Sequence, residues 1–187
     1  MPQQTIPILP VSDAIKASRS KWQYQGEQRP DFAEAPEPGQ ESVWDYPRPP
    51  RIESVDAVVR VFNGKQLIAQ SERAKRVCET ASAPTYYLPP ADVETDLVEY
   101  GEMSSICEWK GVAQSLHVAG VPDAGWRYIR MFEAFSELFE WPSFYPKKLL
   151  CFVDNELVTH QDGGFYGGWV TKSLAGPIKG RPGTEGW

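Results

Sequence analysis

The clearest pattern in the chain is a pair of apolar runs, each predicted to fold back on itself at a two-residue turn. Residues 58–62 are β-branched and aromatic, Asn63-Gly64 is a preferred type I′ turn dipeptide, and residues 65–69 supply the returning strand. A second hairpin is predicted for residues 149–159, around the turn pair Asp154-Asn155. Both patterns favour antiparallel pairing of strands that are neighbours in the chain.

Three further candidate strands lie between the two hairpins. They cover residues 95–100, 105–109 and 114–118, and each is bounded by Gly or Pro. Short strands at this spacing are typical of antiparallel sheets. We therefore expect a mainly β fold, a compact antiparallel sheet domain with one or two short helices.

Two segments have helical patterns instead. Ser71 is predicted to cap a short helix that runs through Cys78, because good helix formers follow its hydroxyl. Apolar residues between positions 131 and 139 recur at helical spacing, and Pro142 ends the pattern. We expect this second segment to be an amphipathic helix packed on the sheet; a partner-binding helix is the alternative.

Residues 1–57 are predicted to form an extended, proline-rich arm. Nine of the seventeen prolines fall in the first fifty residues, a composition that disfavours regular structure. A disordered tail seldom carries many large aromatic side chains. We expect the arm to lie across the domain, or across a neighbouring subunit of a homo-oligomer, with five rings as anchors: Trp22, Tyr24, Phe32, Trp44 and Tyr46.

Length and composition indicate a single domain. The chain has 187 residues and is 41% hydrophobic, enough for one core, which we place in residues 58–187. The net charge of -6 argues against a surface that binds nucleic acid or an anionic membrane. The first eleven residues lack the pattern of a signal peptide, and no segment has the length of a membrane span. We therefore expect a cytoplasmic protein.

Cysteine and histidine are too sparse to predict a metal site or a cofactor. The three cysteines are far apart in sequence and form no CxxC pair, and there are only two histidines. An odd number of cysteines is typical of reduced thiols in a reducing compartment. A nucleophilic pair of Cys107 with His117 is a minor alternative, because no other histidine lies near that cysteine in the sequence.

One acidic cluster allows a competing interpretation. Asp92, Glu94 and Asp96 alternate, so in a strand their carboxylates would share one face and could bind a divalent ion, as nucleotidyl transfer requires. The preceding Pro89-Pro90 instead favours a helix start with Asp92 in its first turn. We prefer the helix start.

Two short passages carry the best candidates for ligand contact. Tyr86 and Tyr87 are adjacent in an extended segment, so one ring can face the core and the other a cleft. Trp109 and Lys110 precede a glycine, which is typical of a strand end where a ligand approaches the backbone. Lys110 beside tyrosine hydroxyls could hold an anionic group; a solvent-facing lysine at a turn is the alternative.

The run from Gly163 to Trp187 is rich in glycine and aromatic residues. Its glycines do not form a phosphate-binding loop, because the GxxxxGK[ST] arrangement is absent. We expect glycine to supply the turns of a wrap that forms one wall or lid of a pocket, and the aromatics to anchor it. The predicted anchors are Phe165, Tyr166, Trp169 and Trp187.

Four blocks in this order resemble a known family: TYYLPPADV, CEWKG, FYPKKLLCFVDNELV and GGFYGGWVTKSLAGPIKGRPGTEGW. They are similar to the domain of unknown function 427 family, also called nucleotidyltransferase-like domain 9. The resemblance covers residues 58–187, and residues 41–51 are similar to a lead-in segment of longer members. Tyr128 matches a family tyrosine, although the proline that usually follows is missing here.

The resemblance implies a β-tent-like fold, a group that includes methionine sulfoxide reductase type B and the ligand-binding domain of cereblon. Many of those relatives bind zinc through CxxC pairs that this chain lacks, so no zinc is carried over. An aromatic pocket on the sheet is what the resemblance implies for this chain.

We therefore expect a binding domain that holds a small, flat, polar molecule in an aromatic pocket. An enzyme of transferase type, with Glu79 or Cys107 perturbed beside Lys110, is one alternative. An assembly module that uses the arm is the other. The predicted ligand contacts are Glu79, Tyr86, Tyr87, Trp109, Lys110, Trp126, Tyr128 and Tyr145.

Overall fold

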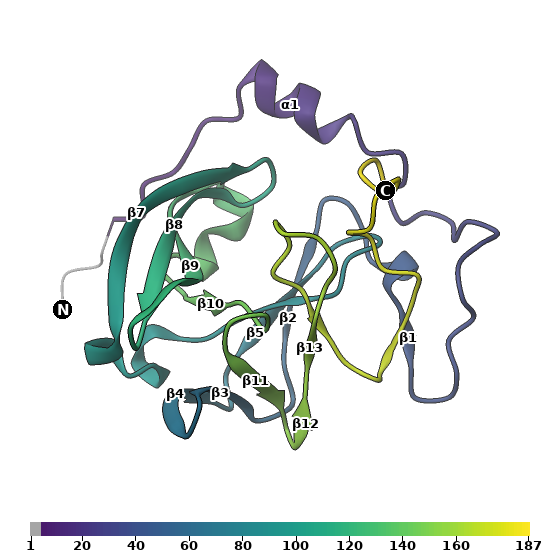
Figure 1. Ribbon diagram of the computed structural model, residues 1–187. Helices are drawn as coiled ribbons and strands as arrows, with labels where there is room; N and C mark the ends of the chain where they lie inside the picture. Colours follow the sequence, from purple (N-terminus) through teal and green to yellow (C-terminus); the bar gives the residue numbers. More distant parts are fainter. Residues whose placement is uncertain (1–4) are drawn as a thin grey trace.

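The computed structural model describes residues 5–187, so the first four residues of the predicted arm lie outside the described range. Most of the regular structure is short β-strand (Figure 1). The helices are α1 (Asp13–Arg19) and the 3-10 helices η1 (Val43–Asp45), η2 (Pro90–Asp92), η3 (Thr95–Leu97) and η4 (Glu133–Leu138). The strands are β1 (Glu41–Ser42), β2 (Arg51–Ser54), β3 (Val59–Asn63), β4 (Gln66–Ser71), β5 (Lys75–Cys78), β6 (Thr85–Tyr87), β7 (Val98–Cys107), β8 (Gly111–Val118), β9 (Val121–Met131), β10 (Ser143–Phe144), β11 (Leu150–Val153), β12 (Glu156–Leu157), β13 (Thr159–His160), β14 (Trp169–Val170) and β15 (Leu174–Ala175).

The strands form several small sheets. The two largest have four strands each, in the orders β10-β9-β8-β7 and β12-β11-β3-β4, and a three-stranded sheet has the order β2-β5-β6. All pairs in these three sheets are antiparallel, while β1 and β15 form a parallel pair. Figure 1 shows the long strands β7, β8 and β9 as one wall, with β2 and β5 crossing beside it. The expected mainly β, antiparallel fold is confirmed.

Both predicted hairpins are present. In the first, β3 pairs with β4, and the turn residues are Gly64 and Lys65, one position later than predicted, because Asn63 pairs with Gln66. Gly64 has φ +59°, a conformation that glycine adopts without steric cost. In the second, β11 pairs with β12 around a turn in which Asp154 also has positive φ.

The central strands differ from the prediction. Residues 98–107 form one continuous strand, β7, with an irregularity between Tyr100 and Ser104, where two separate strands were expected. The eleven-residue strand β9 was not predicted at all. Its Pro122, Asp123 and Gly125 have the composition of a loop, but β8 and β10 pair with it on its two sides and hold it extended. Tertiary pairing therefore overrode the local composition.

Both helix predictions need correction. The helix from Ser71 through Cys78 is wrong, because β5 occupies this segment between β2 and β6. The Ser71 hydroxyl does accept a hydrogen bond from the Arg73 amide, as a cap would, but it closes only a turn. The segment after β9 is helical only as the 3-10 helix η4, which buries Phe135 and Leu138.

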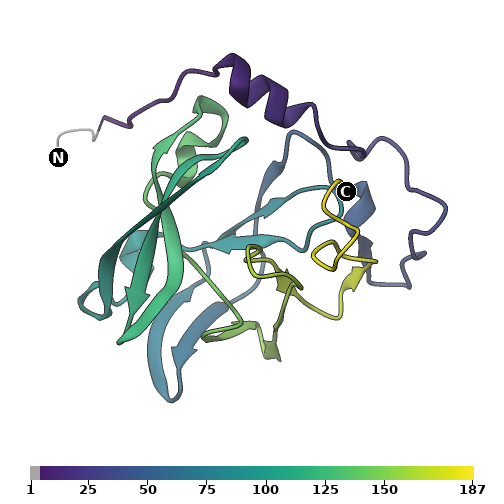
Figure 2. The same cartoon turned by 45° about the horizontal axis from the view of Figure 1, so that its top comes forward.

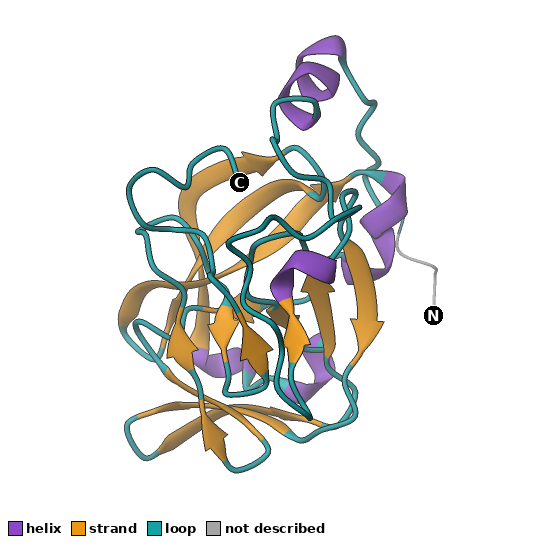
Figure 3. Cartoon of the chain, turned by 90° about the vertical axis from the view of Figure 1, so that its right-hand side faces the viewer, coloured by secondary structure: helices purple, strands orange, loops and turns teal. Residues whose placement is uncertain are grey.

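Residues 5–57 lie across the domain of their own chain. At one end the Leu9 amide donates a 2.7 Å hydrogen bond to the Met131 carbonyl, and the Met131 amide donates to the Pro7 carbonyl at 3.0 Å. Helix α1 then arches over the top of the molecule (Figures 1 and 2). Helix α1 buries no residue and projects from the rest of the molecule (Figure 3). Its last residue, Arg19, reaches the β7–β8 turn and donates a 2.8 Å hydrogen bond to the Glu108 carbonyl. Beyond it, four rings pack together at 5.0–6.0 Å: Tyr24, Phe32, Trp44 and Trp187.

Three buried clusters hold the described chain together. The largest lies between β3, β4, β11 and the C-terminal half of β8, the second faces β9 and η4, and the third joins the arm to the end of β5. The contact of the arm with a neighbouring subunit stays a prediction. None of the helices within residues 5–187 has the length and apolar character needed to span a membrane.

Candidate functional site

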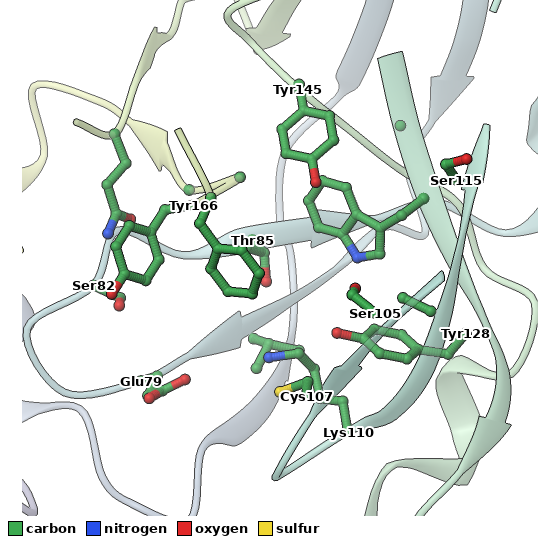
Figure 4. Close-up of a pocket in the computed structure, with 18 of the residues that line it drawn as sticks. Glu79, Ser82, Thr85, Ser105, Cys107, Lys110, Ser115, Tyr128, Tyr145 and Tyr166 are labelled. Atoms are coloured by element: carbon green, nitrogen blue, oxygen red, sulfur yellow. The ribbon is translucent and has the colours of Figure 1, made fainter. Parts of the chain in front are cut away.

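A cavity of about 370 Å³ opens between the β7-β8-β9 wall, strands β5 and β6, and the loop of residues 161–168. Figure 4 shows Tyr145 and Tyr128 on one side of it and Tyr166 on the other, with Thr85 of β6 between them. Long strands supply the floor and a glycine-rich loop supplies the opposite wall. A concave site of this kind, with aromatic walls and a few polar groups, is typical of small-molecule binding.

The structure places six of the eight predicted contacts on the wall of this cavity and two outside it. Tyr86 lies outside, because adjacent residues of β6 face opposite ways: its ring stacks on Trp169 at 4.8 Å in the other core cluster. Trp109 is also outside, buried with the Arg19 guanidinium 5.0 Å from its ring. The six that line the cavity are Glu79, Tyr87, Lys110, Trp126, Tyr128 and Tyr145.

Aromatic rings pack closely along one wall. Trp126 lies 4.6 Å from Tyr145 and 6.2 Å from Tyr87, at 89° to the latter. Gly167 of the opposite loop approaches this indole so closely that an added Cβ would lie 2.2 Å from its Cη2 atom. The loop and the indole therefore fix each other's position, and glycine is needed for the contact.

The polar end of the cavity is organised around the Glu79 carboxylate. Arg48 Nε donates to Glu79 Oε1 at 2.9 Å, and Lys179 Nζ lies 3.6 Å from the same oxygen. Burial alone would raise the pKa of Glu79, but Lys179, Lys110 and Arg48 outweigh it and lower the pKa. The carboxylate is therefore ionised in the folded protein.

Lys110 is buried, and its ammonium lies beside the Cys107 sulfur (Figure 4). Burial would lower its pKa, but Cys107, Tyr87 and Glu79 outweigh burial and raise it, so Lys110 is charged. No ion pair among residues 5–187 involves this ammonium. The alternative of a solvent-facing lysine is wrong, because Lys110 is only 8% exposed and lines the cavity.

Lys179 lines the cavity, although it is not among the eight predicted ligand contacts. It is 1% exposed, and its Nζ lies 4.1 Å from the Trp22 ring centre and 5.2 Å from that of Tyr166. Burial lowers its pKa to about 8; Glu79 acts in the opposite direction, and Arg48 and Lys110 add to the lowering. Nothing in the local sequence of a glycine-rich loop indicates a buried lysine.

A family model described as a domain of unknown function (DUF427) matches residues 51–159, more than half of the chain. The chain belongs to the DUF427 family. The predicted resemblance is thus confirmed, although the match begins earlier than residue 58 and stops before the glycine-rich run. No curated protein matches the sequence. The DUF427 match includes Glu79, Tyr87 and Lys110 but not Lys179 or the loop that faces them.

Several polar atoms of the DUF427 cavity are buried without a hydrogen-bond partner in the described chain. They are the hydroxyl of Tyr87, the hydroxyl of Ser115 and one carboxylate oxygen of Asp123. The Tyr87 side chain is fully buried, yet its hydroxyl makes no hydrogen bond of proper geometry with nearby Tyr128 or Lys110. Buried polar groups normally find a partner, so these residues of the cavity lining hold hydrogen-bonding capacity that the described chain leaves unused.

The structure does not bring Cys107 and His117 together as a nucleophilic pair. Cys107 pairs with Gly111 and His117 with Glu99, at opposite ends of the β7–β8 hairpin and roughly 20 Å apart at about 3.3 Å per residue. A Cys107–His117 pair is therefore wrong. His117 Nδ1 accepts a hydrogen bond from the Asp123 amide at 3.0 Å, so the other ring nitrogen carries the proton in the neutral ring.

The carboxylate cluster does not form a metal site. Asp92 lies in η2 after Pro89-Pro90, as preferred, and accepts hydrogen bonds from Ser71 at 2.6 Å and Arg73 at 2.5 Å. Within the described residues no group of three His, Cys, Asp or Glu side chains could hold a metal ion. Asp92 is therefore a structural residue that ties β4 to η2.

The glycine-rich run forms the cavity wall, but its aromatics differ in role. Trp169 is fully buried and its Nε1 donates to the Phe144 carbonyl at 2.9 Å, so it is an anchor. Tyr166 lines the cavity, and Trp187 stacks on Phe32 at 5.0 Å. Phe165 is 71% exposed, so its prediction as an anchor is wrong. It lies at the cavity mouth instead.

Proposed function

We propose that this DUF427 domain binds a small, planar, polar molecule, with an anionic or hydrogen-bond-accepting group of the ligand directed at Lys110. The observation that carries the proposal is the pair of Lys110 and Tyr87 at the cavity wall. Within the part of the chain that the structure describes, Lys110 is a buried cation without an ion pair, and Tyr87 has a buried hydroxyl without a hydrogen-bond partner. A ligand acceptor group placed between them would satisfy both.

The shape and lining of the cavity support a flat ligand. Its volume of about 370 Å³ is near the lower end of the range of roughly 300–1,000 Å³ seen for small-molecule pockets. Trp126 and Tyr145 offer ring faces, which favour planar molecules by stacking. We also infer a cytoplasmic location, since all three cysteines are free and two of them are buried.

A thermal-shift screen tests the proposal. Planar carboxylates, such as benzoate and nicotinate, should raise the melting temperature more than their amides or than planar cations, because only the carboxylates pair with Lys110. A ligand at 100 times its dissociation constant adds about 2.7 kcal/mol to stability. Absence of any shift across planar acids, amides and nucleotides would exclude the proposal.

Matched variants separate binding at this site from binding elsewhere. Lys110→Gln removes the cavity cation and should abolish the shift, whereas Lys65→Gln alters an exposed lysine on the β3–β4 turn and should preserve it. Circular dichroism verifies that both variants are folded. A shift that survives in Lys110→Gln would place the ligand outside the cavity.

A further inference from the structure

The environment of Lys179 is unusual for a lysine that has no role in ligand chemistry. Its amine lies at the cavity wall, almost fully buried between the rings of Trp22 and Tyr166. Among residues 5–187 its only ion-pair contact is the 3.6 Å approach to Glu79, which is longer than a hydrogen bond. The side chain is held in place by packing, while its amine keeps free hydrogen-bonding capacity.

The charge count at this end of the cavity disfavours a protonated Lys179. Three cations act on the carboxylate of Glu79: Arg48, Lys110 and Lys179. A second carboxylate of the cavity lining, Glu108, accepts a 2.8 Å hydrogen bond from Trp22 Nε1 and forms no ion pair with Lys179 among the described residues. Arg48 cannot lose its proton in a protein, and the neighbours of Lys110 raise its pKa. Tyr166, the other titratable group in contact with Lys179, is neutral, because burial and Glu79 raise its pKa. Lys179 is therefore the group that relieves the excess of positive charge.

We propose that Lys179 is a nucleophilic amine that forms a reversible imine with the aldehyde group of a planar ligand held in the cavity. The inference rests on the proposed function, since the same aromatic walls would orient the aldehyde. Its geometric basis is a cavity-lining amine fixed between two rings and adjacent to one carboxylate. Amine nucleophiles of this kind are activated by burial and by neighbouring cations.

The proton balance of the step is complete with the groups present. The Lys179 ammonium first loses one proton, to Glu79 or to water. The neutral nitrogen attacks the carbonyl carbon and passes one of its two protons, through Glu79 or water, to the carbonyl oxygen, which gives a carbinolamine. The second nitrogen proton is transferred to the hydroxyl by the same route, the hydroxyl leaves as water, and the C=N bond remains. Overall, one amine and one aldehyde give one imine and one water, and no oxidant or reductant is required.

Reductive trapping tests the proposal on the full chain. The protein is incubated at pH 7 with 4-carboxybenzaldehyde and sodium cyanoborohydride, which reduces an imine to a stable secondary amine, and modified lysines are mapped by mass spectrometry. At pH 7 an amine with a pKa of about 8 is about one-tenth unprotonated, against roughly 1 part in 2,500 for an ordinary lysine. We expect Lys179 to be labelled at least about tenfold faster than exposed Lys65, with a rate that rises with pH to a midpoint near pH 8.

A Lys179 variant tests whether this amine forms the adduct, and a second aldehyde tests whether the aromatic pocket is needed. Lys179→Arg keeps the cation and the aliphatic stem but should abolish the fast adduct. Formaldehyde, which needs no aromatic pocket, should label Lys179 with the same pH profile. Fast labelling by formaldehyde alone would overturn the planar-aldehyde ligand, and no fast labelling by either aldehyde would overturn the nucleophile. A fast adduct that persists in Lys179→Arg would also overturn it.

A binding measurement distinguishes this proposal from the one on which it rests. Terephthalate has the carboxylate and the ring of the probe but no aldehyde, so it reports non-covalent binding by thermal shift. Binding of terephthalate without an adduct at Lys179 would overturn the imine and leave the planar-ligand site intact. If terephthalate does not bind and no adduct forms at Lys179, both the planar-ligand site and the imine are overturned.

Discussion

Arg48 donates a 2.9 Å hydrogen bond to the Glu79 carboxylate, although the two residues come from the segment before β2 and the segment after β5. The same guanidinium donates to three backbone carbonyls, those of Tyr24, Thr80 and Trp187. One buried side chain thus joins the N-terminal arm, the cavity and the C-terminal segment.

Replacing Arg48 should therefore destabilise the whole chain. Arg48→Met leaves a buried carboxylate with one partner fewer and three carbonyls without donors, so the free energy of unfolding should fall by about 3 kcal/mol or more. Urea denaturation measures this. Arg29→Met, which breaks an exposed ion pair with Asp45, is the control and should have little effect on the free energy of unfolding. Equal losses in the two variants would contradict the central role of Arg48.

Tyr87→Phe should separate ligand binding from stability. It removes a buried hydroxyl that has no partner, so the free energy of unfolding should stay within about 0.5 kcal/mol or rise. The affinity for a planar carboxylate should fall about tenfold, because a hydrogen bond to the ligand is worth about 1.4 kcal/mol. Thermal unfolding with and without benzoate measures both quantities.

The matched control for that variant is Tyr86→Phe, one residue earlier. Tyr86 faces the core away from the cavity and contacts Arg76 through its hydroxyl. Its loss should lower stability by about 1 kcal/mol and leave benzoate binding unchanged. A reversal of this pattern would mean that the tyrosines have been assigned to the wrong faces.

Gly167→Ala should close the cavity from the loop side. The new methyl group would lie 2.2 Å from the Trp126 ring, so the indole or the loop must move, at a cost of about 1–3 kcal/mol. Gly164→Ala is the control in the same loop, since no atom lies within 4 Å of its added Cβ. We expect a lower melting temperature and lost benzoate binding only for Gly167→Ala, and identical behaviour of the two variants would refute the contact.

Stability should fall at alkaline pH because of the buried cysteines. Burial raises the pKa of Cys78 from 9.0 to about 12, with Glu53 and Glu41 adding to the effect against Arg76, and burial also raises that of Cys151. Above pH 9 the unfolded chain loses these protons while the folded chain keeps them. Unfolding is then favoured by up to about 1.4 kcal/mol per pH unit for each thiol.

Cys78→Ala tests the alkaline effect directly. The variant is less stable at every pH because it leaves a cavity, but its loss of stability between pH 8 and pH 10 should be smaller than that of the native chain. Urea titrations under reducing conditions at pH 8, 9 and 10 give the two slopes. Parallel curves would show that the Cys78 thiol titrates in the folded state as it does in the unfolded state.

Local sequence was sufficient where neighbours in the chain decide the structure. The β3–β4 and β11–β12 hairpins were predicted from turn dipeptides flanked by apolar runs, although the first turn lies one residue later than predicted. The helix start at Pro90 follows from the fixed φ of proline. Six of the eight predicted ligand contacts line one cavity. They were predicted because they are aromatic or charged residues in strands or at strand ends, and such residues also tend to line pockets.

Long-range pairing decided the remainder. The local sequence of β9 has the composition of a loop, but β8 and β10 pair with it and hold it as a strand. The local sequence of β5 predicts a helix, but pairing with β2 and β6 makes it a strand. The alternation of Tyr86 and Tyr87 could be predicted, but which of them faces the cavity could not, since register alone selects the face.

The sequence by itself determined that the chain is mainly β, that its arm carries aromatic anchors, and that tyrosine, tryptophan and Lys110 are the candidates for ligand contact. Only the tertiary structure decided that Lys179, 69 residues beyond Lys110, shares the Glu79 carboxylate with it. The physical reason is that burial and charge depend on neighbours brought together by folding. A lysine in a glycine-rich loop becomes a buried amine only when Trp22, Tyr166 and Arg48 surround it.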